Sequence, residues 1–120
     1  MNKGRVGQDI CDRTKSYALR IIKLYQALGK TGAGKVLGNQ LLRSGTSIGA
    51  NVEEAQAGHS KADFVYKINI ALKEARESRY WLSLISEASL IPSNKLAEII
   101  NETEELIKIL FSISQSGKKK

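Results

Sequence analysis

One apolar stripe limits the fold of this chain more than any other feature. Between residues 35 and 57, apolar side chains lie three, four or seven residues apart, at Leu37, Leu41, Ile48, Val52 and Ala55. This spacing places them on one side of an α-helix that packs against another element along its whole length. The stripe stays in phase across SGTSIGAN, a segment of low helix propensity. The sequence therefore predicts one long helix over about 35–57.

The small residues in the middle of this helix allow two interpretations. Gly45 and Gly49 lie about one turn apart, with serine and alanine residues beside them. Small residues at this spacing let a neighbouring backbone come close, so we expect Gly45 and Gly49 to be helix-packing positions. The alternative is a loop over Ser44–Gly49 that splits the helix. The unbroken phase of the stripe favours the continuous helix.

Three further segments have helical periodicity, and the connections between them are short. With the first stripe they predict helices at about 8–28, 35–57, 61–88 and 93–113. Ser60 is placed to cap the third helix, and Pro92 precedes the fourth. Residues 114–120, SQSGKKK, are predicted to form a frayed basic tail. The predicted fold is all-α: a single antiparallel up-down-up-down four-helix bundle over residues 1–120.

The third helix is more apolar than one bundle requires. Beside its main stripe, Ile70, Trp81, Leu84 and Ala88 widen the apolar arc past half of the helix surface. An excess of this kind indicates self-association. We therefore expect a homo-oligomer, with Trp81 as an anchor in the core or at an interface.

Glu74 falls inside this apolar arc, and Arg79 lies towards one edge of it. A charge removed from water needs a partner, so one interpretation is a polar network between helices or subunits, with Arg43, Asn51 or Arg79. The alternative is a rotation of the helix that leaves the charged groups in water while their stems pack. In both cases the role of Glu74 and Arg79 is structural.

Charge is unevenly distributed along the chain, whose net charge is +7. Residues 1–43 hold nine Lys and Arg against two acids, residues 44–117 hold seven against ten, and the chain ends in three lysines. The candidate nucleic-acid-binding residues are Arg13, Arg20, Lys23, Lys30, Lys118, Lys119 and Lys120. They would bind the phosphates of RNA or DNA with little sequence preference. The alternative is a solvated basic face that only maintains solubility.

Residue types for catalysis and metal binding are scarce. With one His and one Cys, neither a zinc site nor a Cys–His nucleophile has a recognisable spacing, and a di-iron centre lacks its Glu-x-x-His pairs. The glycines of KTGAGKVLG do not fit the pattern of a phosphate-binding loop, and no strand precedes them. We therefore expect no enzyme, no catalytic residue, no cofactor and no metal.

The expected location is the cytoplasm, without a membrane segment. No apolar run approaches the length that spans a bilayer, and the N-terminal cations are not followed by the apolar stretch of a secretory signal. A single cysteine, Cys11, cannot form an internal disulfide, which is typical of a reducing compartment.

Three segments carry a resemblance to a known family: LLRSGTSIGANVEEAQ, SKADFVYKI and ALKEARESRYWL. They resemble the signature of small bacterial four-helix-bundle proteins known from intervening sequences of 23S ribosomal RNA genes. The chain is also similar to the accessory variability determinants of diversity-generating retroelements, which are basic pentamers that associate with nucleic acid and a reverse transcriptase. The resemblance implies a homo-pentameric ring with no established enzymatic activity.

Two functional hypotheses follow from these observations. In the first, the protein is a non-enzymatic, oligomeric accessory protein that binds RNA or DNA. In the second, it is a protein-interaction scaffold whose positive charge is incidental. Salt-dependent binding of nucleic acid separates the two, because phosphate contacts weaken steeply as salt rises.

Overall fold

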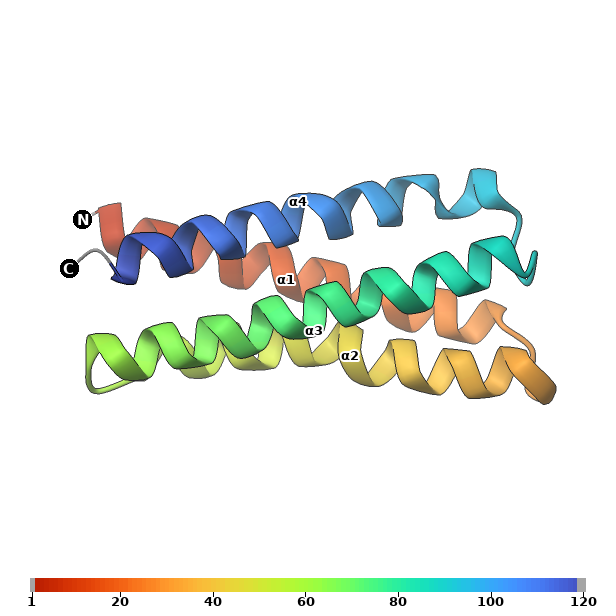
Figure 1. Ribbon diagram of the computed structural model, residues 1–120, viewed down its shortest axis with the longest axis horizontal. Helices are drawn as coiled ribbons and strands as arrows, with labels where there is room; N and C mark the ends of the chain where they lie inside the picture. Colours follow the sequence, from red (N-terminus) through yellow and green to blue (C-terminus); the bar gives the residue numbers. More distant parts are fainter. Residues whose placement is uncertain (1, 119–120) are drawn as a thin grey trace.

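The computed structural model describes the backbone of residues 2–118 and the side chains of residues 7–117. Its helices are α1 (Asn2–Ala27), α2 (Gly32–Gln56), α3 (Lys61–Glu87) and α4 (Ser93–Lys118). They form a rod of 46 × 22 × 20 Å, so each helix runs nearly the full length of the molecule (Figure 1). The predicted all-α four-helix bundle is confirmed.

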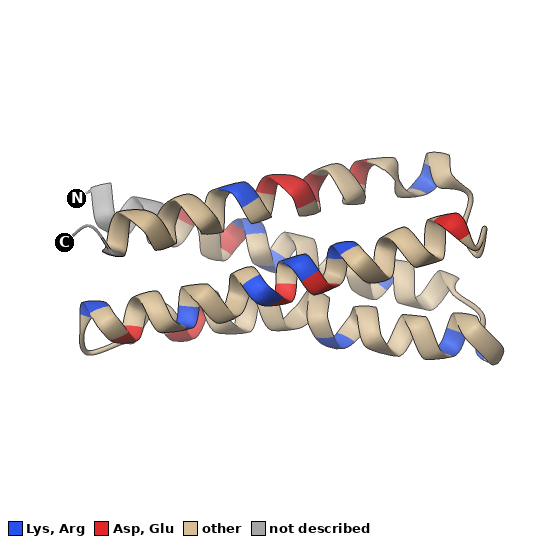
Figure 2. Cartoon of the chain, in the orientation of Figure 1, with Lys and Arg blue, Asp and Glu red and all other residues tan. Residues whose placement is uncertain are grey.

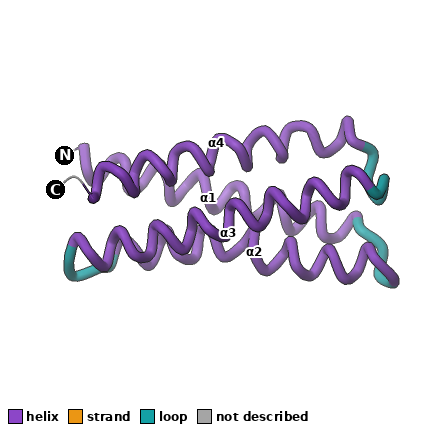
Figure 3. The backbone as a smooth tube through the Cα atoms, in the orientation of Figure 1, coloured by secondary structure: helices purple, strands orange, loops and turns teal. Residues whose placement is uncertain are grey.

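Helices that are consecutive in the sequence are neighbours in space and run antiparallel. α1 packs on α2, α2 on α3 and α3 on α4, whereas α1 and α4 pack together much less extensively. The connections lie at the two ends of the rod, and both chain termini lie at the end that holds the α2–α3 connection (Figures 1 and 3). Two surface cavities, of about 420 and 360 Å³, lie along the α1–α4 boundary. This boundary is therefore the most open of the four.

The apolar stripes predicted from the sequence meet along the axis of the rod. The fully buried apolar side chains include one or more from every helix: Ile21, Leu41, Ile48, Val52, Ile68, Leu82, Ile85, Leu96, Leu106 and Leu110. Leu37 and Phe64 are half-buried at the edges of this core. Within residues 2–118, no helix is both long and apolar enough to cross a membrane.

α2 is continuous through SGTSIGAN, so the alternative of a loop over Ser44–Gly49 is wrong. The hydroxyl groups of this segment bond to carbonyl groups of the preceding turn. Thr46 donates to the Leu42 carbonyl at 2.7 Å, and Ser47 donates to the Arg43 carbonyl at 2.6 Å. These bonds satisfy the polar side chains within the helix, where they would otherwise compete for the backbone.

Three helix boundaries differ from the prediction by three residues or more, and one of them is the start of α2, at Gly32 instead of about residue 35. α1 begins at Asn2, earlier than residue 8, and α4 extends to Lys118, beyond residue 113. The prediction of a frayed tail from residue 114 is therefore wrong as far as Lys118. The physical reason is a hydrogen bond to α3: Ser114 is buried and donates to Asn69 at 2.6 Å, which holds the last turns of α4 on the bundle.

The ends of α3 are closed by two different local structures. At its start, Ser60 accepts a hydrogen bond from the Asp63 backbone N–H at 3.1 Å, as the capping pattern predicts. At its end, the N–H groups of Ser89 and Leu90 donate to the carbonyls of Ser86 and Ile85. This is a Schellman motif, and it places Ser89 at a positive φ of 57°. The chain has already left the helix there, before Pro92.

Replacing Ser89 with glycine should stabilise the protein. Glycine has no Cβ and adopts positive φ without the steric cost that serine bears. The left-handed cost of about 1–2 kcal/mol is partly offset by the greater backbone entropy that glycine loses on folding, so we expect Ser89→Gly to raise the free energy of unfolding by about 0.5–1 kcal/mol, measured by urea denaturation. Ser89→Ala keeps the Cβ and serves as the control. A gain in the alanine variant equal to that in the glycine variant would contradict the explanation.

Candidate functional site

A layer of hydroxyl groups lies in the middle of the core, with one residue from each helix. Tyr17 of α1 and Thr103 of α4 share a hydrogen bond at 2.6 Å, and Ser44 of α2 and Ser78 of α3 share one at 2.8 Å. All four side chains are at most 1% exposed. Burial raises the pKa of Tyr17 to about 12, although hydrogen bonds with Thr103 and Ser78 act against this.

Every hydroxyl in this layer has a partner. Thr103 also donates to the Ile99 carbonyl at 2.7 Å, and no buried side-chain N or O atom among the described residues lacks a hydrogen bond. A shift of one helix along its neighbour would leave buried hydroxyls unpaired, which costs about 1–3 kcal/mol for each group. The layer therefore fixes the register of the four helices. The residue pattern within each helix does not show that Tyr17 and Thr103 pair, because they lie on different helices.

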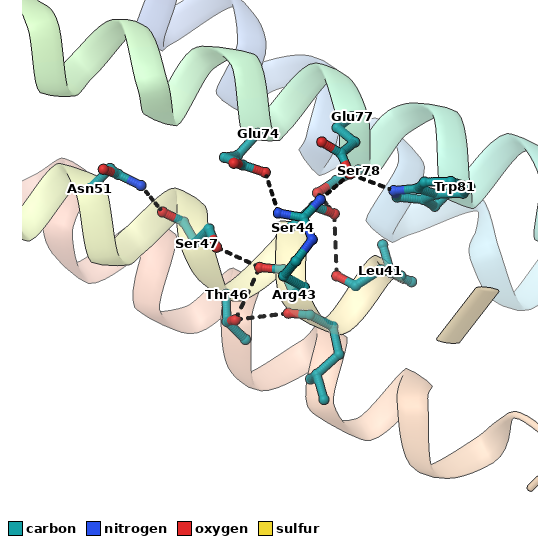
Figure 4. Close-up of polar contacts among 11 residues, drawn as sticks. Leu41, Arg43, Ser44, Thr46, Ser47, Asn51, Glu74, Glu77, Ser78 and Trp81 are labelled. Carbon is teal, nitrogen blue, oxygen red and sulfur yellow. Dashed lines mark hydrogen bonds and ion pairs between the residues drawn. The ribbon is translucent and has the colours of Figure 1, made fainter. Parts of the chain in front are cut away.

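On the outside of the α2–α3 boundary, Arg43 holds two carboxylates of α3 (Figure 4). Its guanidinium donates to Glu74 at 3.2 Å and also to Glu77, and Glu77 in turn accepts from the indole N–H of Trp81 at 3.0 Å. The Trp81 bond, followed by Arg43, lowers the pKa of Glu77. Glu74 is only 12% exposed, so its charge is compensated by Arg43 where water is scarce.

Two residues considered for this network lie elsewhere. Asn51 donates to the Ser47 carbonyl of its own helix at 2.9 Å (Figure 4). Arg79 points to the opposite edge of α3 and binds Glu104 of α4 at 3.1 Å. Trp81 is half-buried, with the Tyr80 ring at 5.2 Å in an edge-to-face arrangement. It therefore lies at the surface end of the network and packs against the edge of the core.

Acidic side chains of α4 lie close to two of the predicted nucleic-acid-binding residues of α1. Arg13 binds the Glu102 carboxylate with two hydrogen bonds, at 2.7 and 2.9 Å, and this pairing raises the pKa of Arg13. Arg20 lies 3.8 Å from Glu98. Lys23 and Lys30 are exposed and make no ion pair with the described side chains. The predicted residues Lys118, Lys119 and Lys120 lie outside the described side chains.

Gly45 and Gly49 lie where α2 packs against α1. A Cβ added at Gly45 would be 2.9 Å from the Cγ1 atom of Ile21, closer than two carbon atoms can approach without a shift. At Gly49 it would be 3.3 Å from the Thr14 hydroxyl oxygen and 3.4 Å from the Thr14 carbonyl oxygen. The two helices thus approach closely at these positions, with Ile21 filling the space that a side chain at residue 45 would need.

Comparison with known proteins assigns the chain to a family. Residues 7–112 match the family model described as 23S rRNA-intervening sequence protein. The chain belongs to this family. A solved structure described as a protein of unknown function from the S23 ribosomal protein family of Bacteroides thetaiotaomicron is 41% identical, with a TM-score of 0.83. The match covers 92% of this chain and 98% of that one, and no curated protein matches the sequence.

In this 23S rRNA-intervening sequence protein, acidic and basic side chains are unevenly distributed along the helices. The middle of α4 carries Glu98, Glu102, Glu104 and Glu105, whereas the N-terminal half of α2 carries only basic charges (Figure 2). At the α1–α2 connection a cavity of about 490 Å³ is lined by Lys30 and Lys35 together with neutral residues. Lys30 and Lys35 therefore carry positive charge with no acid among the residues that line this cavity.

Among the residues that the structure describes, the remaining reactive groups are not assembled into a site. The thiol of Cys11 is buried, and burial is the main cause that raises its pKa to about 11. A thiol with that pKa is a weak nucleophile near neutral pH because little of it is ionised. Over the described side chains, no three His, Cys, Asp or Glu residues are grouped to hold a metal ion.

Adding a methyl group at Gly45 should destabilise the bundle. The clash with Ile21 should outweigh the helix-propensity gain of about 0.5–1 kcal/mol, so we expect Gly45→Ala to cost about 1–3 kcal/mol in unfolding free energy. Gly49→Ala meets Thr14 at nearly ordinary distances and should be nearly neutral. Urea denaturation of both variants tests this. Equal stability of the two would refute close packing at residue 45.

The buried Tyr17 should make the protein sensitive to alkali. Its phenol ionises near pH 10 when unfolded but near 12 in the folded protein. The stabilising contribution is therefore complete below pH 10 and disappears as pH rises from 10 to 12. Unfolding free energies measured across this range should fall less steeply for Tyr17→Phe than for the wild type. The exposed Tyr66→Phe control should keep the wild-type slope, and a Tyr17→Phe slope equal to it would contradict the assignment.

Proposed function

We propose that this protein is a non-enzymatic, homo-oligomeric accessory protein that binds the phosphates of RNA or DNA and acts with 23S rRNA intervening sequences. The observation that carries the proposal is a group of uncompensated lysines at the α1–α2 end of the bundle. Lys23, Lys30 and Lys35 are exposed and form no ion pair within the described side chains. The family supports RNA as the relevant polyanion through its relation to ribosomal RNA genes.

Lysines without an acidic partner among the described side chains are better suited to phosphate binding than the ion-paired arginines of α1. A phosphate that approached Arg13 would compete with the two hydrogen bonds to Glu102, and the nearby carboxylate would repel it. Lys30 and Lys35 face no acid among the residues that line their shared cavity. Their charge is therefore available for counterion release, which drives phosphate binding.

Self-association would strengthen such a weak site. A few lysines on one bundle bind phosphate modestly, but a ring repeats them, and linked sites bind a long polyanion far more tightly than each alone. The family resemblance implies five copies. The half-buried Trp81, with Tyr66 and Tyr80 exposed on the same helix, supports self-association of this chain.

The second candidate function is a protein-interaction scaffold without nucleic-acid binding. The same exposed aromatic residues favour it, because Tyr66 and Tyr80 are 64% and 56% exposed and suit a protein partner. The two candidates differ in their response to salt. Hydrophobic protein contacts change little with moderate salt, whereas phosphate contacts weaken steeply.

Removal of the cavity lysines should weaken nucleic-acid binding at every sequence. We expect Lys30→Gln combined with Lys35→Gln to lower the slope of log affinity against log salt by about 0.7–0.9 for each phosphate that the variant no longer neutralises. Fluorescence anisotropy with a labelled 23S rRNA fragment and an unrelated RNA of equal length measures this. Light scattering on the same variant should give the wild-type mass.

The matched control removes the same charge elsewhere. Lys61→Gln combined with Arg76→Gln changes the net charge equally, at exposed positions that form no ion pair in the described part of the chain. This control should keep most of the affinity and the salt slope. Equal reductions in the two double variants would show that only overall charge matters. No binding by the wild type at low salt would support the scaffold.

A further inference from the structure

The outward side of α3 carries a second periodic stripe, distinct from the one in the core. Its members are separated by four and three residues in turn: Tyr66, Ile70, Lys73, Glu77, Tyr80 and Leu84. At about 100° per residue they lie opposite the buried Ile68, Ala75 and Leu82. Alternating four–three spacing is the pattern by which one helix packs along another. We call these six residues the α3 outer stripe.

The apolar members of the α3 outer stripe remain accessible to water. Tyr66 is 64% and Tyr80 56% exposed, and Ile70 and Leu84 are half-buried. They extend from residue 66 to residue 84 of one helix, about 27 Å. Large apolar groups in a row on a helix surface indicate a covered face, because each would be stabilised by removal from water.

The charges of the α3 outer stripe identify what covers it. Read from either end, the stripe has two apolar positions, then a charged pair of opposite sign at its centre, Lys73 and Glu77. We propose that a second copy of this chain packs against the α3 outer stripe with the two α3 helices antiparallel. Lys73 of each copy then faces Glu77 of the other, Ile70 faces Tyr80, and Tyr66 faces Leu84.

The opposite orientation is unfavourable for the same charges. In a parallel pair, Lys73 would face Lys73 of the other copy and Glu77 would face Glu77, and like charges across an interface repel. Glu77 is also held in place before the second copy arrives, because Trp81 and Arg43 both donate to its carboxylate. Its side chain is still 28% exposed, which leaves room for a lysine of the second copy.

This interface rests on the proposed function, in which the protein self-associates. It specifies the surface through which two copies meet and the symmetry that relates them. It is two-fold, since the same residues meet from both copies, whereas a five-membered ring joins two different surfaces. The α3 pair thus joins two copies about a two-fold axis.

Thiol cross-linking tests the antiparallel register directly. The full-length variants Ile70→Cys and Tyr80→Cys are prepared separately, mixed in equal amounts and treated with a short bismaleimide. The mixture should give a covalent dimer containing one of each, because residue 70 faces residue 80 of the other copy. Each variant alone should give none, since its own thiols lie about 15 Å apart along the antiparallel pair. The wild type, with only the buried Cys11, controls for background.

Each cross-linking result supports or contradicts a specific part of the proposal. Dimers in either single variant would overturn the antiparallel register and indicate a parallel pair. No dimer in the mixture, from a protein whose wild-type form is oligomeric by light scattering, would overturn the α3 interface but leave the proposed oligomer standing. A monomeric wild type would overturn both.

Charge reversal provides a second test that does not depend on cysteine chemistry. Lys73→Glu places two carboxylates opposite each other and should raise the dissociation constant of the pair by about ten-fold or more, and Glu77→Lys should do the same. Mixing the two variants restores opposite charges at both central positions, so association should recover. Circular dichroism checks that each variant folds. Failure of the mixture to recover, with both variants folded, would overturn the proposed pairing.

Discussion

The central hydroxyl layer determines how the four helices can be arranged. Aliphatic packing alone would tolerate a shift of one helix along another by a turn, because leucine and isoleucine occur along the whole length of the core. Tyr17 with Thr103, and Ser44 with Ser78, remove that freedom, since any other register leaves buried hydroxyls without partners. The Tyr17–Thr103 bond matters most, because it crosses the α1–α4 boundary, where other packing is sparse.

Once the register is fixed, it also decides which charges remain available. The register brings Arg13 within reach of Glu102 and Arg79 within reach of Glu104. Two carboxylates of α4 therefore form ion pairs within the same molecule. These pairs lie near the surface, and each contributes little to stability. Their larger effect is on function, because they remove two arginines from the cations that a polyanion could reach and leave lysines at the α1–α2 end.

α3 packs against the other helices with one side and faces solvent with the other. Its inner side supplies Ile68, Leu82 and Ile85 to the core, and its edges bind Arg43 of α2 and Glu104 of α4. This leaves an outer side with more apolar surface than a monomer needs. A helix bound on three sides is rigid, and a rigid surface gives up little conformational entropy when a partner binds.

The sequence by itself determined the number of helices, their order and the sides that they bury. Those properties depend on residue spacing within one helix, as in the stripe from Leu37 to Ala55, and local periodicity is enough to show them. The continuity of α2 could be predicted for the same reason. Only the tertiary structure decided the pairing of Tyr17 with Thr103, the hydrogen bond of Ser114 to Asn69, and which cations of α1 form ion pairs with α4. Each depends on which residue of another helix lies at the same level of the bundle, and the pattern within a single helix does not contain that information.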